Sequence, residues 1–379
     1  MKKDIYGTQL SNYTDFCMKS GFKGKSPENI NQILDEIIDL YKCLSCKLVF
    51  HSEADNKMSS RLIKNSSISI NNEKLFITKL KQEAGINNIS KMTQMIKDLE
   101  LNKKIIDDYK LTGSNGIPNG IKFNIQIISE SAWDINKNSI LKIKIPKFLN
   151  YCVEDFENFY IMKNKSRKLI WCFGLSKIEI QYLCFTNKNI SISSLPQFLI
   201  LLELEKYNKL TLEKISKLLD CDLKTILTDI SGLVYNPSFN QNGQKDNGLI
   251  LGTFNDKTKE FKGTDEIYFN NNFTCPRKKF LTLPLTKKLT EDEANQIEKD
   301  NLEIRKSYQN NILKATITRI MKSRKGRRTT HVWLINETSR QIDLFNAQPQ
   351  QIKENIEKLI ELNIIKRNDK DRTCYEYVA

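Results

Sequence analysis

Residues 315–325 read ATITRIMKSRK, and this stretch decides how the last part of the chain folds. It predicts the end of a long helix that begins near Glu291 and stops near Lys325. Around it lies a run of basic residues without a single acid: Lys314, Arg319, Lys322, Arg324, Lys325, Arg327 and Arg328. Charge alone does not decide the function of this cluster, because many surface lysines are merely solvated.

This helix end is the first helix of a winged helix that we predict over residues 305–379. Its second helix covers residues 332–342, and its third opens at Pro349, a favoured first-turn residue, and runs through Leu362. Residues 364–367 and 373–377 read as two strands around a turn. We therefore assign residues 291–379 to a linker helix and a C-terminal winged helix.

A helical bundle is predicted over residues 1–110. Ser26-Pro27-Glu28 reads as an N-cap, a first-turn proline and an acid that matches the helix dipole, and apolar side chains then recur at helical spacing. A further helix covers residues 73–83 and stops at Gly85, and a third covers residues 90–99. Their apolar stripes are typical of core packing.

An α/β unit is predicted over residues 111–205. Two strand-like runs, residues 168–173 and 177–185, suggest a β-hairpin. An apolar helix opens at Leu195 and continues through Leu204, and we expect it to pack beneath that sheet.

A first winged helix is predicted over residues 206–290. Thr211 caps one helix, a second runs from Asp222 through Ile230, and strands follow. Residues 240–262 are rich in Gly, Asn, Asp and Lys, which predicts an insertion rather than a core element. The predicted fold class is α+β and mainly helical, with a helical bundle, an α/β unit and two winged-helix domains.

Composition limits the function classes. Of the 379 residues 39% are apolar, and the formal charge of +15 implies an acidic partner, with nucleic acid as the first suspect. No apolar run approaches the length that spans a bilayer, so no membrane partner is expected. Nine irregularly spaced cysteines suit a reducing compartment, and we expect the cytoplasm and nucleus.

Catalytic and metal chemistry find few candidates. Cys43-Leu44-Ser45-Cys46 is the only CxxC, and with only His51 and His331 in the chain a tetrahedral zinc site would lack ligands. Its surroundings look like an amphipathic helix, so we interpret both cysteines as small core-facing residues. Neither histidine lies beside a nucleophile motif. We expect no catalytic residue, metal or cofactor.

The basic helix and the chain end Tyr375-Glu376-Tyr377-Val378-Ala379 together resemble the C-terminal module of the cullins. In that family a helix ending Ile-Met-Lys-x-Arg-Lys carries the lysine that accepts a ubiquitin-like modifier. The resemblance implies that Lys322 is this neddylation acceptor, flanked by the basic residues Arg319, Arg324 and Lys325. On spacing alone, Lys322 would be one more solvated lysine.

The resemblance extends over nearly the whole chain. Residues 71–85 resemble the family's Ser-Lys-Leu-Lys-x-x-Cys-Gly helix, and residues 91–101 its partner, Lys-Leu-x-x-Met-x-x-Asp-Met. Residues 167–171 resemble the Arg-Lys-Leu-x-Trp strand, residues 194–202 the Thr-Phe-Gln-Met helix, and residues 269–273 a shortened form of the Phe-x-x-Asn-x-x-Phe region. Each piece is weak alone, but their order makes the resemblance specific.

The resemblance implies a non-catalytic scaffold of a multisubunit RING ubiquitin ligase. Its α/β unit would pair with a strand of a RING-box protein, whose RING recruits a ubiquitin-conjugating enzyme, and modification of Lys322 would loosen the last winged helix and free the RING domain. Such main-chain pairing needs only an open edge or gap. The predicted RING-box-binding residues are Leu169, Ile170, Trp171, Cys172, Phe173, Ile178, Ile180 and Tyr182.

The chain also departs from the family pattern. Cullins usually have Asp-Arg where this chain has Tyr308-Gln309, and two extra residues separate Lys325 from His331. The family's N-terminal stalk, which binds the substrate adaptor, has no counterpart before Met1, so we expect either a fragment or a reduced protein.

The main alternative is a winged-helix nucleic-acid-binding protein, with Arg319, Arg324, Arg327 and Arg328 on phosphates. Against it, the later helix that usually enters the groove carries three acids here: Glu354, Glu357 and Glu361. A third interpretation, the cullin-like subunit of the anaphase-promoting complex, is disfavoured by the complete acceptor motif.

Overall fold

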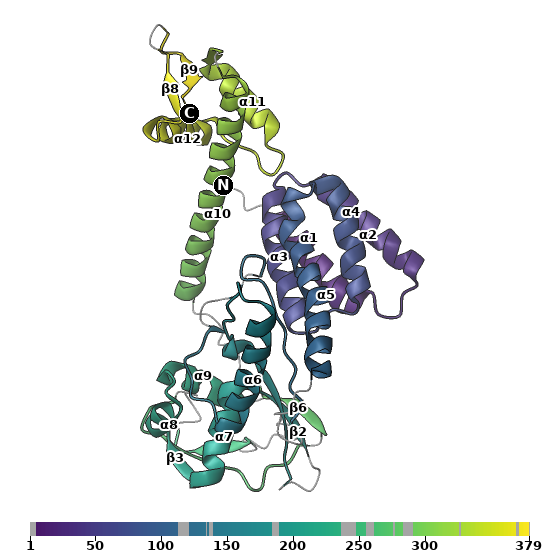
Figure 1. Cartoon of the computed structure of the whole chain (residues 1–379), viewed down its shortest axis with the longest axis vertical. Helices are drawn as coiled ribbons and strands as arrows, with labels where there is room; N and C mark the ends of the chain where they lie inside the picture. Colours follow the sequence, from purple (N-terminus) through teal and green to yellow (C-terminus); the bar gives the residue numbers. More distant parts are fainter. Residues whose placement is uncertain are drawn as a thin grey trace. The chain divides into compact units, whose positions relative to one another are not determined.

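The structure is a computed structural model that describes residues 5–112, 121–133, 135, 139–183, 189–235, 248–254, 261–275, 277–282, 291–325, 327–368 and 371–378. Helices dominate it, and three small three-stranded sheets accompany them (Figure 1). This confirms the predicted fold class. The chain forms two compact units, one of residues 1–101, 127–134 and 289–379, the other of residues 102–126 and 135–288. The four predicted domain boundaries stay a prediction.

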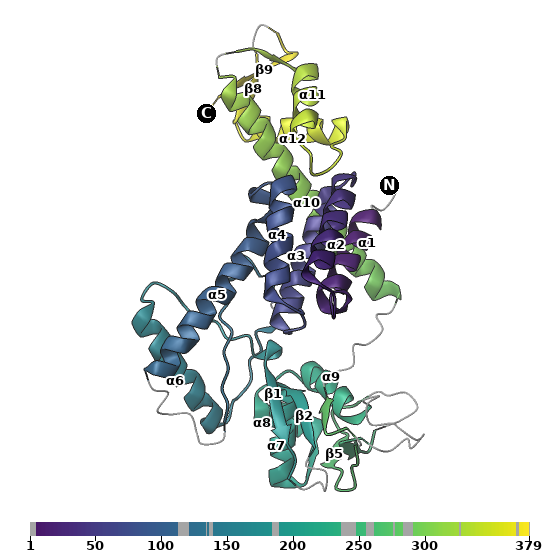
Figure 2. The same ribbon diagram turned by 90° about the vertical axis from the view of Figure 1, so that its right-hand side faces the viewer.

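The N-terminal part is a bundle in which α1 to α4 lie side by side (Figure 2). The helices are α1 (Ile5–Phe16), a π-helix (Cys17–Gly21), α2 (Pro27–Lys42), α3 (Lys47–Ile63), α4 (Ile70–Ala84), a 3-10 turn (Asn87–Ile89) and α5 (Ser90–Leu111). Ser26 accepts from the Asn29 N–H as the predicted N-cap, and Gly85 ends α4 with a positive φ of 80°. The predicted stop at residue 99 is wrong, because neither glycine nor proline interrupts α5 there.

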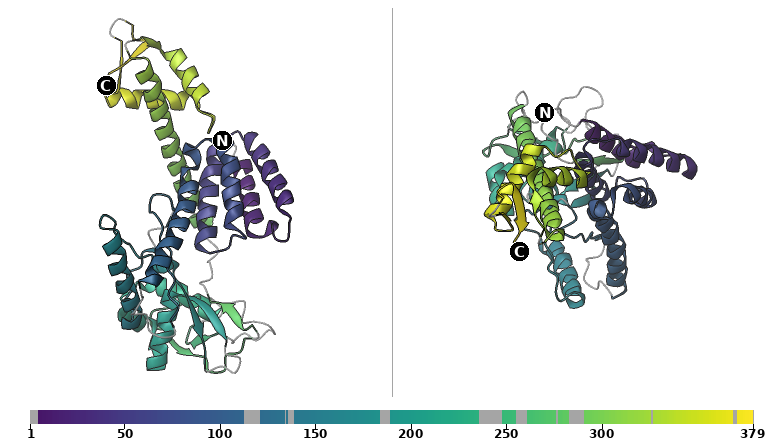
Figure 3. Two further views of the ribbon diagram at one scale, coloured as in Figure 1. Left: turned by 45° about the vertical axis from the view of Figure 1, so that its right-hand side comes forward. Right: turned by 90° about the horizontal axis from the view of Figure 1, so that it is seen from above.

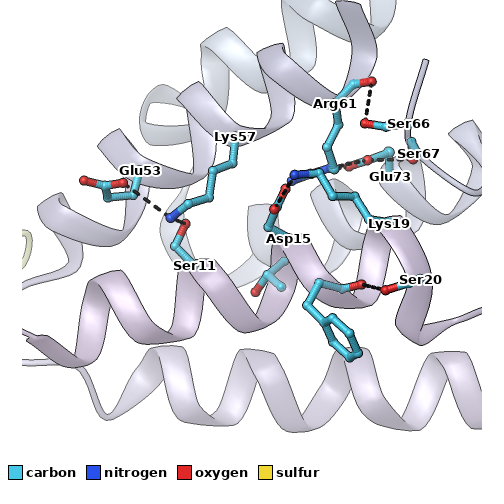
Figure 4. Close-up of polar contacts among 12 residues, drawn as sticks. Ser11, Asp15, Lys19, Ser20, Glu53, Lys57, Arg61, Ser66, Ser67 and Glu73 are labelled. Atoms are coloured by element: carbon cyan, nitrogen blue, oxygen red, sulfur yellow. Dashed lines mark hydrogen bonds and ion pairs between the residues drawn. The ribbon is translucent and has the colours of Figure 1, made fainter. Parts of the chain in front are cut away.

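A buried ionic cluster, Arg61 with Glu73 and Asp15, ties three helices of the bundle together (Figure 4). The Arg61 guanidinium donates to both carboxylate oxygens of Glu73 at 2.9 Å and to Asp15 at 2.8 Å. The Ser67 hydroxyl donates to Glu73 at 2.8 Å. Since Arg61 is 3% exposed and Glu73 0% exposed, each charge depends on these partners rather than on water.

The interpretation of both CxxC cysteines as core-facing is wrong for Cys43 and holds in part for Cys46. Cys43 directly follows α2 and is exposed, whereas Cys46 directly precedes α3, is half-buried and packs partly against a core. The Cys43 N–H donates to the Leu40 carbonyl at 3.1 Å, so the pair lies in the turn between two helices. None of the helices in the described ranges combines the length and apolar character that crossing a membrane requires.

The second unit contains a small sheet with the order β1-β2-β6, built from β1 (Lys177–Gln181), β2 (Ile190–Ser194) and β6 (Lys279–Leu281). β1 is antiparallel to β2, and β2 is parallel to β6. α6 (Lys147–Lys163) precedes the sheet in sequence, and α7 (Leu195–Tyr207) follows β2 directly. Ser194 and Gln197 form a capping box at the start of α7, whose apolar side chains pack against this sheet as predicted.

The predicted hairpin of residues 168–173 and 177–185 is wrong. Residues 168–172 form no strand, Phe173–Leu175 is a 3-10 turn, and β1 pairs with β2 instead. Gly174 approaches the Ser139 backbone so closely that a Cβ there would lie 3.1 Å from it. The turn at this close approach separates the two runs, and residues 184–188 lie outside the described ranges.

The first winged helix is β3 (Lys209–Thr211), α8 (Leu212–Leu219), α9 (Leu223–Val234), β4 (Ile250–Gly252) and β5 (Glu266–Phe269), with the sheet order β3-β5-β4. It shares one apolar core with α7 and the β1-β2-β6 sheet. The expected insertion at residues 240–262 contains β4, so part of it is a core element. Residues 240–247 and 255–260 lie outside the described ranges.

The C-terminal module consists of the end of α10 (Glu291–Ser323), β7 (Thr329–Thr330), α11 (His331–Gln341), α12 (Pro349–Glu361), β8 (Ile365–Arg367) and β9 (Cys374–Tyr377). The sheet order is β7-β9-β8. In each view, the yellow-green helices and yellow strands gather around one end of α10 (Figure 3). The long linker helix and the second winged helix are thus confirmed as elements.

Candidate functional site

Lys322 lies in the last turn of α10, on the side that faces away from the core. The buried side chains of this part of the helix recur at helical spacing and pack against α11, α12 and β9: Leu313, Ile317, Ile320 and Met321. Ala315, Arg319 and Lys322 lie on the opposite stripe and are exposed. The helix therefore buries its apolar face and presents the Lys322 amine to solvent.

Two contacts to α11 flank Lys322. One turn earlier, an Nη2 of Arg319 donates to the Gln341 Oε1 at 3.1 Å. Two residues later, the Arg324 guanidinium lies over the Trp333 ring, 4.1 Å from its centroid. Lys325 is exposed beyond the helix end. Among the described residues no ion pair involves Lys322, so its amine is open to a reagent of the right shape.

Sequence reasoning found Lys322, Arg319, Arg324 and Lys325 but missed the two residues on α11 that hold the arginines. A signal for one of them existed. Thr330 lies two residues before the apolar run Val332-Trp333-Leu334, where a threonine reads as an N-cap, and its hydroxyl accepts from the Trp333 N–H at 3.4 Å. That cap places Trp333 in the first turn of α11. Nothing local pointed to Gln341.

The predicted RING-box-binding residues fall into two groups. Ile178 and Ile180 lie on β1 and pack partly against the core, and Tyr182, just past β1, is buried with its hydroxyl 2.9 Å from that of Ser191. Of the strands that the structure describes, β1 pairs only with β2. Among the described strands, β1 therefore lies at one edge of this sheet.

The second group lies outside any strand: Leu169, Ile170, Trp171, Cys172 and Phe173. The Trp171 ring stacks parallel to Phe173, with centroids 6.0 Å apart, and its Nε1 donates to Glu157 of α6. Ile170, directly before Trp171, is 55% exposed. This segment is held by its aromatic side chains and offers an apolar residue to solvent.

The two histidines occupy structural positions. His51 is buried with its Nε2 2.9 Å from the Tyr41 hydroxyl, and burial lowers its pKa to about 4. The His331 Nδ1 lies 2.9 Å from the Tyr375 hydroxyl. Within the described ranges, no three His, Cys, Asp or Glu side chains are grouped so that they could hold a metal ion.

Three family models match the chain in sequence order. Residues 4–106 match the cullin alpha solenoid domain, residues 127–273 the cullin alpha+beta domain, and residues 309–371 the cullin protein neddylation domain. Lys322 and both of its flanking contacts fall within the third match.

Curated relatives include Cullin-6 of Caenorhabditis elegans, which is 28% identical over 98% of this chain and 48% of its own length. Cullin-1 of Dictyostelium discoideum is 28% identical and Cullin-3 of Schizosaccharomyces pombe 26% identical, each over 98% of this chain and 46% of its own length. The chain thus spans about half the length of these relatives.

A solved Dcn1(P)-Cdc53(WHB) structure, described under a dual E3 mechanism for Rub1 ligation, is 35% identical over 25% of this chain and all of its own, with a TM-score of 0.20. The family assignment rests on the three models instead. Because they follow one another in order and together cover most of the chain, this chain belongs to the cullin family.

Proposed function

We propose that this chain is the scaffold of a multisubunit RING ubiquitin ligase and that it is activated by a ubiquitin-like modifier joined to Lys322. One observation carries the proposal. Lys322 is an exposed amine at the end of a packed helix, inside the part of the chain that matches the neddylation domain. The chain itself contributes no catalytic residue in this proposal, and it works in the cytoplasm and nucleus.

The modification is an aminolysis. The neutral Lys322 Nζ attacks the carbonyl carbon of a thioester that links the modifier's C-terminus to a cysteine of a conjugating enzyme. A C–N bond forms, the C–S bond breaks, the cysteine leaves as thiolate, and the amine proton passes to solvent. The reaction asks only that this chain present the amine, so an exposed lysine without an ion-pair partner is suited to it.

The position of β1 at an edge of its sheet, among the described strands, supports the proposed RING-box contact. A strand from a RING-box protein would pair with the main chain of β1 (Lys177–Gln181). The neighbouring segment with Ile170 offers apolar surface to the same partner. The RING would then recruit the ubiquitin-conjugating enzyme. This chain would thus hold that enzyme through the RING-box protein and would present Lys322 to the enzyme that carries the modifier.

The test is co-expression with a RING-box protein, followed by reconstituted neddylation and mass spectrometry. We expect a stable complex and a single modifier on Lys322, which the Lys322→Arg variant loses. Lys325→Arg is the matched control and keeps the modification. A complex that forms as well with Ile178→Arg and Ile180→Arg would contradict the edge contact, and modification at other lysines in Lys322→Arg would contradict the acceptor.

Nucleic-acid binding is the weaker candidate. Two of its phosphate-contacting candidates, Arg319 and Arg324, already contact α11, and α12 exposes Glu354, Glu357 and Glu361. A steep salt dependence of binding to duplex DNA, lost in Arg327→Gln/Arg328→Gln, would support this alternative instead.

A further inference from the structure

Two chemically equivalent amines lie close together at the end of α10. Lys322 is in the last helical turn, and Lys325 is three residues further along, beyond the end of the helix. Both side chains are exposed. A thioester that reaches one of them can reach the other unless the protein fixes their positions differently, so the choice between the two amines needs a structural cause.

The two contacts to α11 bracket Lys322 and not Lys325. Arg319 with Gln341 fixes the helix one turn before Lys322, and Arg324 with Trp333 fixes the chain two residues after it. Between these points the Ile320 and Met321 side chains are buried. A helix end that would otherwise fray is thus held from three directions around one lysine.

The Arg324 side chain stacks on the Trp333 ring. Its Nε is buried and has no hydrogen-bond partner among the described atoms, so the face of the Trp333 ring takes the place of water. Glu337, one turn further along α11, lies close enough for the Arg324 charge to lower the pKa of its carboxyl, after larger effects from Arg340 and Gln341. Without the Trp333 ring, the Arg324 guanidinium would lose this stacking contact and would no longer be held in its position.

Backbone hydrogen bonds link the residues on both sides of Arg324, Lys325 among them. The Lys325 N–H donates to the Lys322 carbonyl at 3.3 Å, and the Arg327 N–H donates to the Arg324 carbonyl at 2.8 Å. Together with the bond from the Arg324 N–H to the Met321 carbonyl at 3.2 Å, they form successive turns before and after the stacked residue. If Arg324 leaves the ring, these turns loosen, and Lys325 gains reach while Lys322 loses its fixed position.

We propose that Arg324 and Trp333 are positioning residues that select Lys322 over Lys325 as the amine acylated by the conjugating enzyme's thioester. The inference rests on the proposed modification of Lys322 and adds the device that makes it specific. Neither residue touches the reacting atoms. Their effect is on where the amine is held, so it acts on the rate of transfer and on the choice of lysine.

The enzymatic test compares Trp333→Leu, Trp333→Phe and Arg324→Gln in reconstituted modification, with sites mapped by mass spectrometry. For Trp333→Leu we expect transfer to Lys322 to slow about fivefold to tenfold at saturating conjugating enzyme, with little change in KM, and a share of modifier to move to Lys325. Trp333→Phe keeps a ring face and should rescue most of the selectivity. Val332→Ala, an exposed neighbour on the same turn, is the matched control.

A second test needs no enzyme. A small N-hydroxysuccinimide ester acylates exposed amines, and peptide mapping gives the ratio of acylated Lys322 to acylated Lys325. We expect this ratio to shift toward Lys325 in Trp333→Leu and in Arg324→Gln but not in Val332→Ala. An unchanged ratio in well-folded variants overturns the inference. A shifted ratio in a protein that the enzymes leave unmodified would overturn the proposed function while supporting the positioning role.

Discussion

The two winged helices of this chain share one plan and differ in what they do with the helix that enters them. Each has a short strand that runs directly into a helix, and each sheet places its third strand in the middle, as β3-β5-β4 and β7-β9-β8. Each strand-to-helix step is capped by a threonine, Thr211 before α8 and Thr330 before α11, at 3.4 Å. Local sequence builds the same frame twice.

The difference lies in the connection before the first strand. Asn208, with a φ of 56°, alone separates α7 from β3, whereas residues 324–328 separate α10 from β7. Lys206 in the last turn of α7 is ion-paired with Glu203 at 2.6 Å. The same spacing before Lys322 finds Arg319, which contacts α11 instead. One module ties its terminal lysine down, and the other presents it.

The largest expected effect tests whether the two modules are separate in stability. Ile215 of α8 and Leu334 of α11 each lie four residues after the capping threonine, and each is 0% exposed. Alanine at either position should cost about 2–5 kcal/mol. Hydrogen exchange should locate the loss in residues 195–282 for Ile215→Ala and in residues 310–378 for Leu334→Ala.

The conservative replacements Ile215→Val and Leu334→Met should cost less than about 1.5 kcal/mol and serve as controls. If either alanine variant raised exchange in both modules equally, the two would form one cooperative unit.

Acidification should separate the modules with opposite signs. Burial raises the pKa of Asp229 in the first module to about 6, although a hydrogen bond from Ser194 opposes it. The folded state therefore holds this proton more tightly than the unfolded chain. Its stabilisation is complete below about pH 4 and is lost as the pH rises through 6, an effect of at most roughly 3 kcal/mol.

In the second module burial, with the charges of Lys353 and Arg367, lowers the pKa of His331. Stability from this group is present above about pH 6.5 and falls on acidification below it. Thermal unfolding between pH 4 and 8 should show each slope flatten in Asp229→Asn and in His331→Gln respectively. Slopes of the same sign in the two variants would contradict the assignment.

Removal of the shared caps should have equal and smaller effects. Thr211→Ala and Thr330→Ala each lose one side-chain acceptor for a backbone N–H, at a cost of about 1 kcal/mol. Denaturant titration of both variants measures this directly, with Thr→Ser at each position as the control that keeps the hydroxyl. Costs that differ by several-fold would mean that the threonines are not equivalent.

The smallest effect is expected from a substitution that gives Lys322 the acidic neighbour that Lys206 has in the first module. Arg319→Glu gives Lys322 the same partner at i−3 that Lys206 has in Glu203, and an exposed pair of this kind is worth about 0.2–1 kcal/mol. Modification of Lys322 should slow about twofold to fivefold, as kinetics with the reconstituted enzymes would measure. Arg319→Gln removes the charge without an acid, and if it slows the reaction equally, the ion pair is not the cause.

Features with a local cause could be predicted from the sequence. The starts of three helices could be predicted from Ser26, Thr211 and Pro349, because capping depends on neighbours within one turn. The hairpin prediction failed because residues 168–172 form no strand: the ring and hydrogen-bond contacts of Trp171 hold that segment outside the sheet, and β1 pairs with β2 instead.

The candidate site divides in the same way. Residues 315–325 identified the helix and its basic cluster, and the role of Lys322 came from resemblance. The exposure of Lys322 could be seen only from the packing of α10 in the structure. The contacts of Arg324 with Trp333 and of Arg319 with Gln341 also required the fold, because both partners lie on a different helix, α11. Sequence named the lysine, and the structure supplies the surroundings that make it distinct from Lys325.

The buried cluster of Arg61, Glu73 and Asp15 has a consequence for how this family member can drift in sequence. A neutral residue at position 61 would leave Glu73 charged and dry, which typically costs about 3–5 kcal/mol, whereas joint replacement by apolar side chains of similar volume is often tolerated. A substitution at only one of these positions is therefore disfavoured, whereas the joint replacement is tolerated. Positions 15, 61 and 73 should therefore change together in sequences that evolve from this one, although they lie on three different helices.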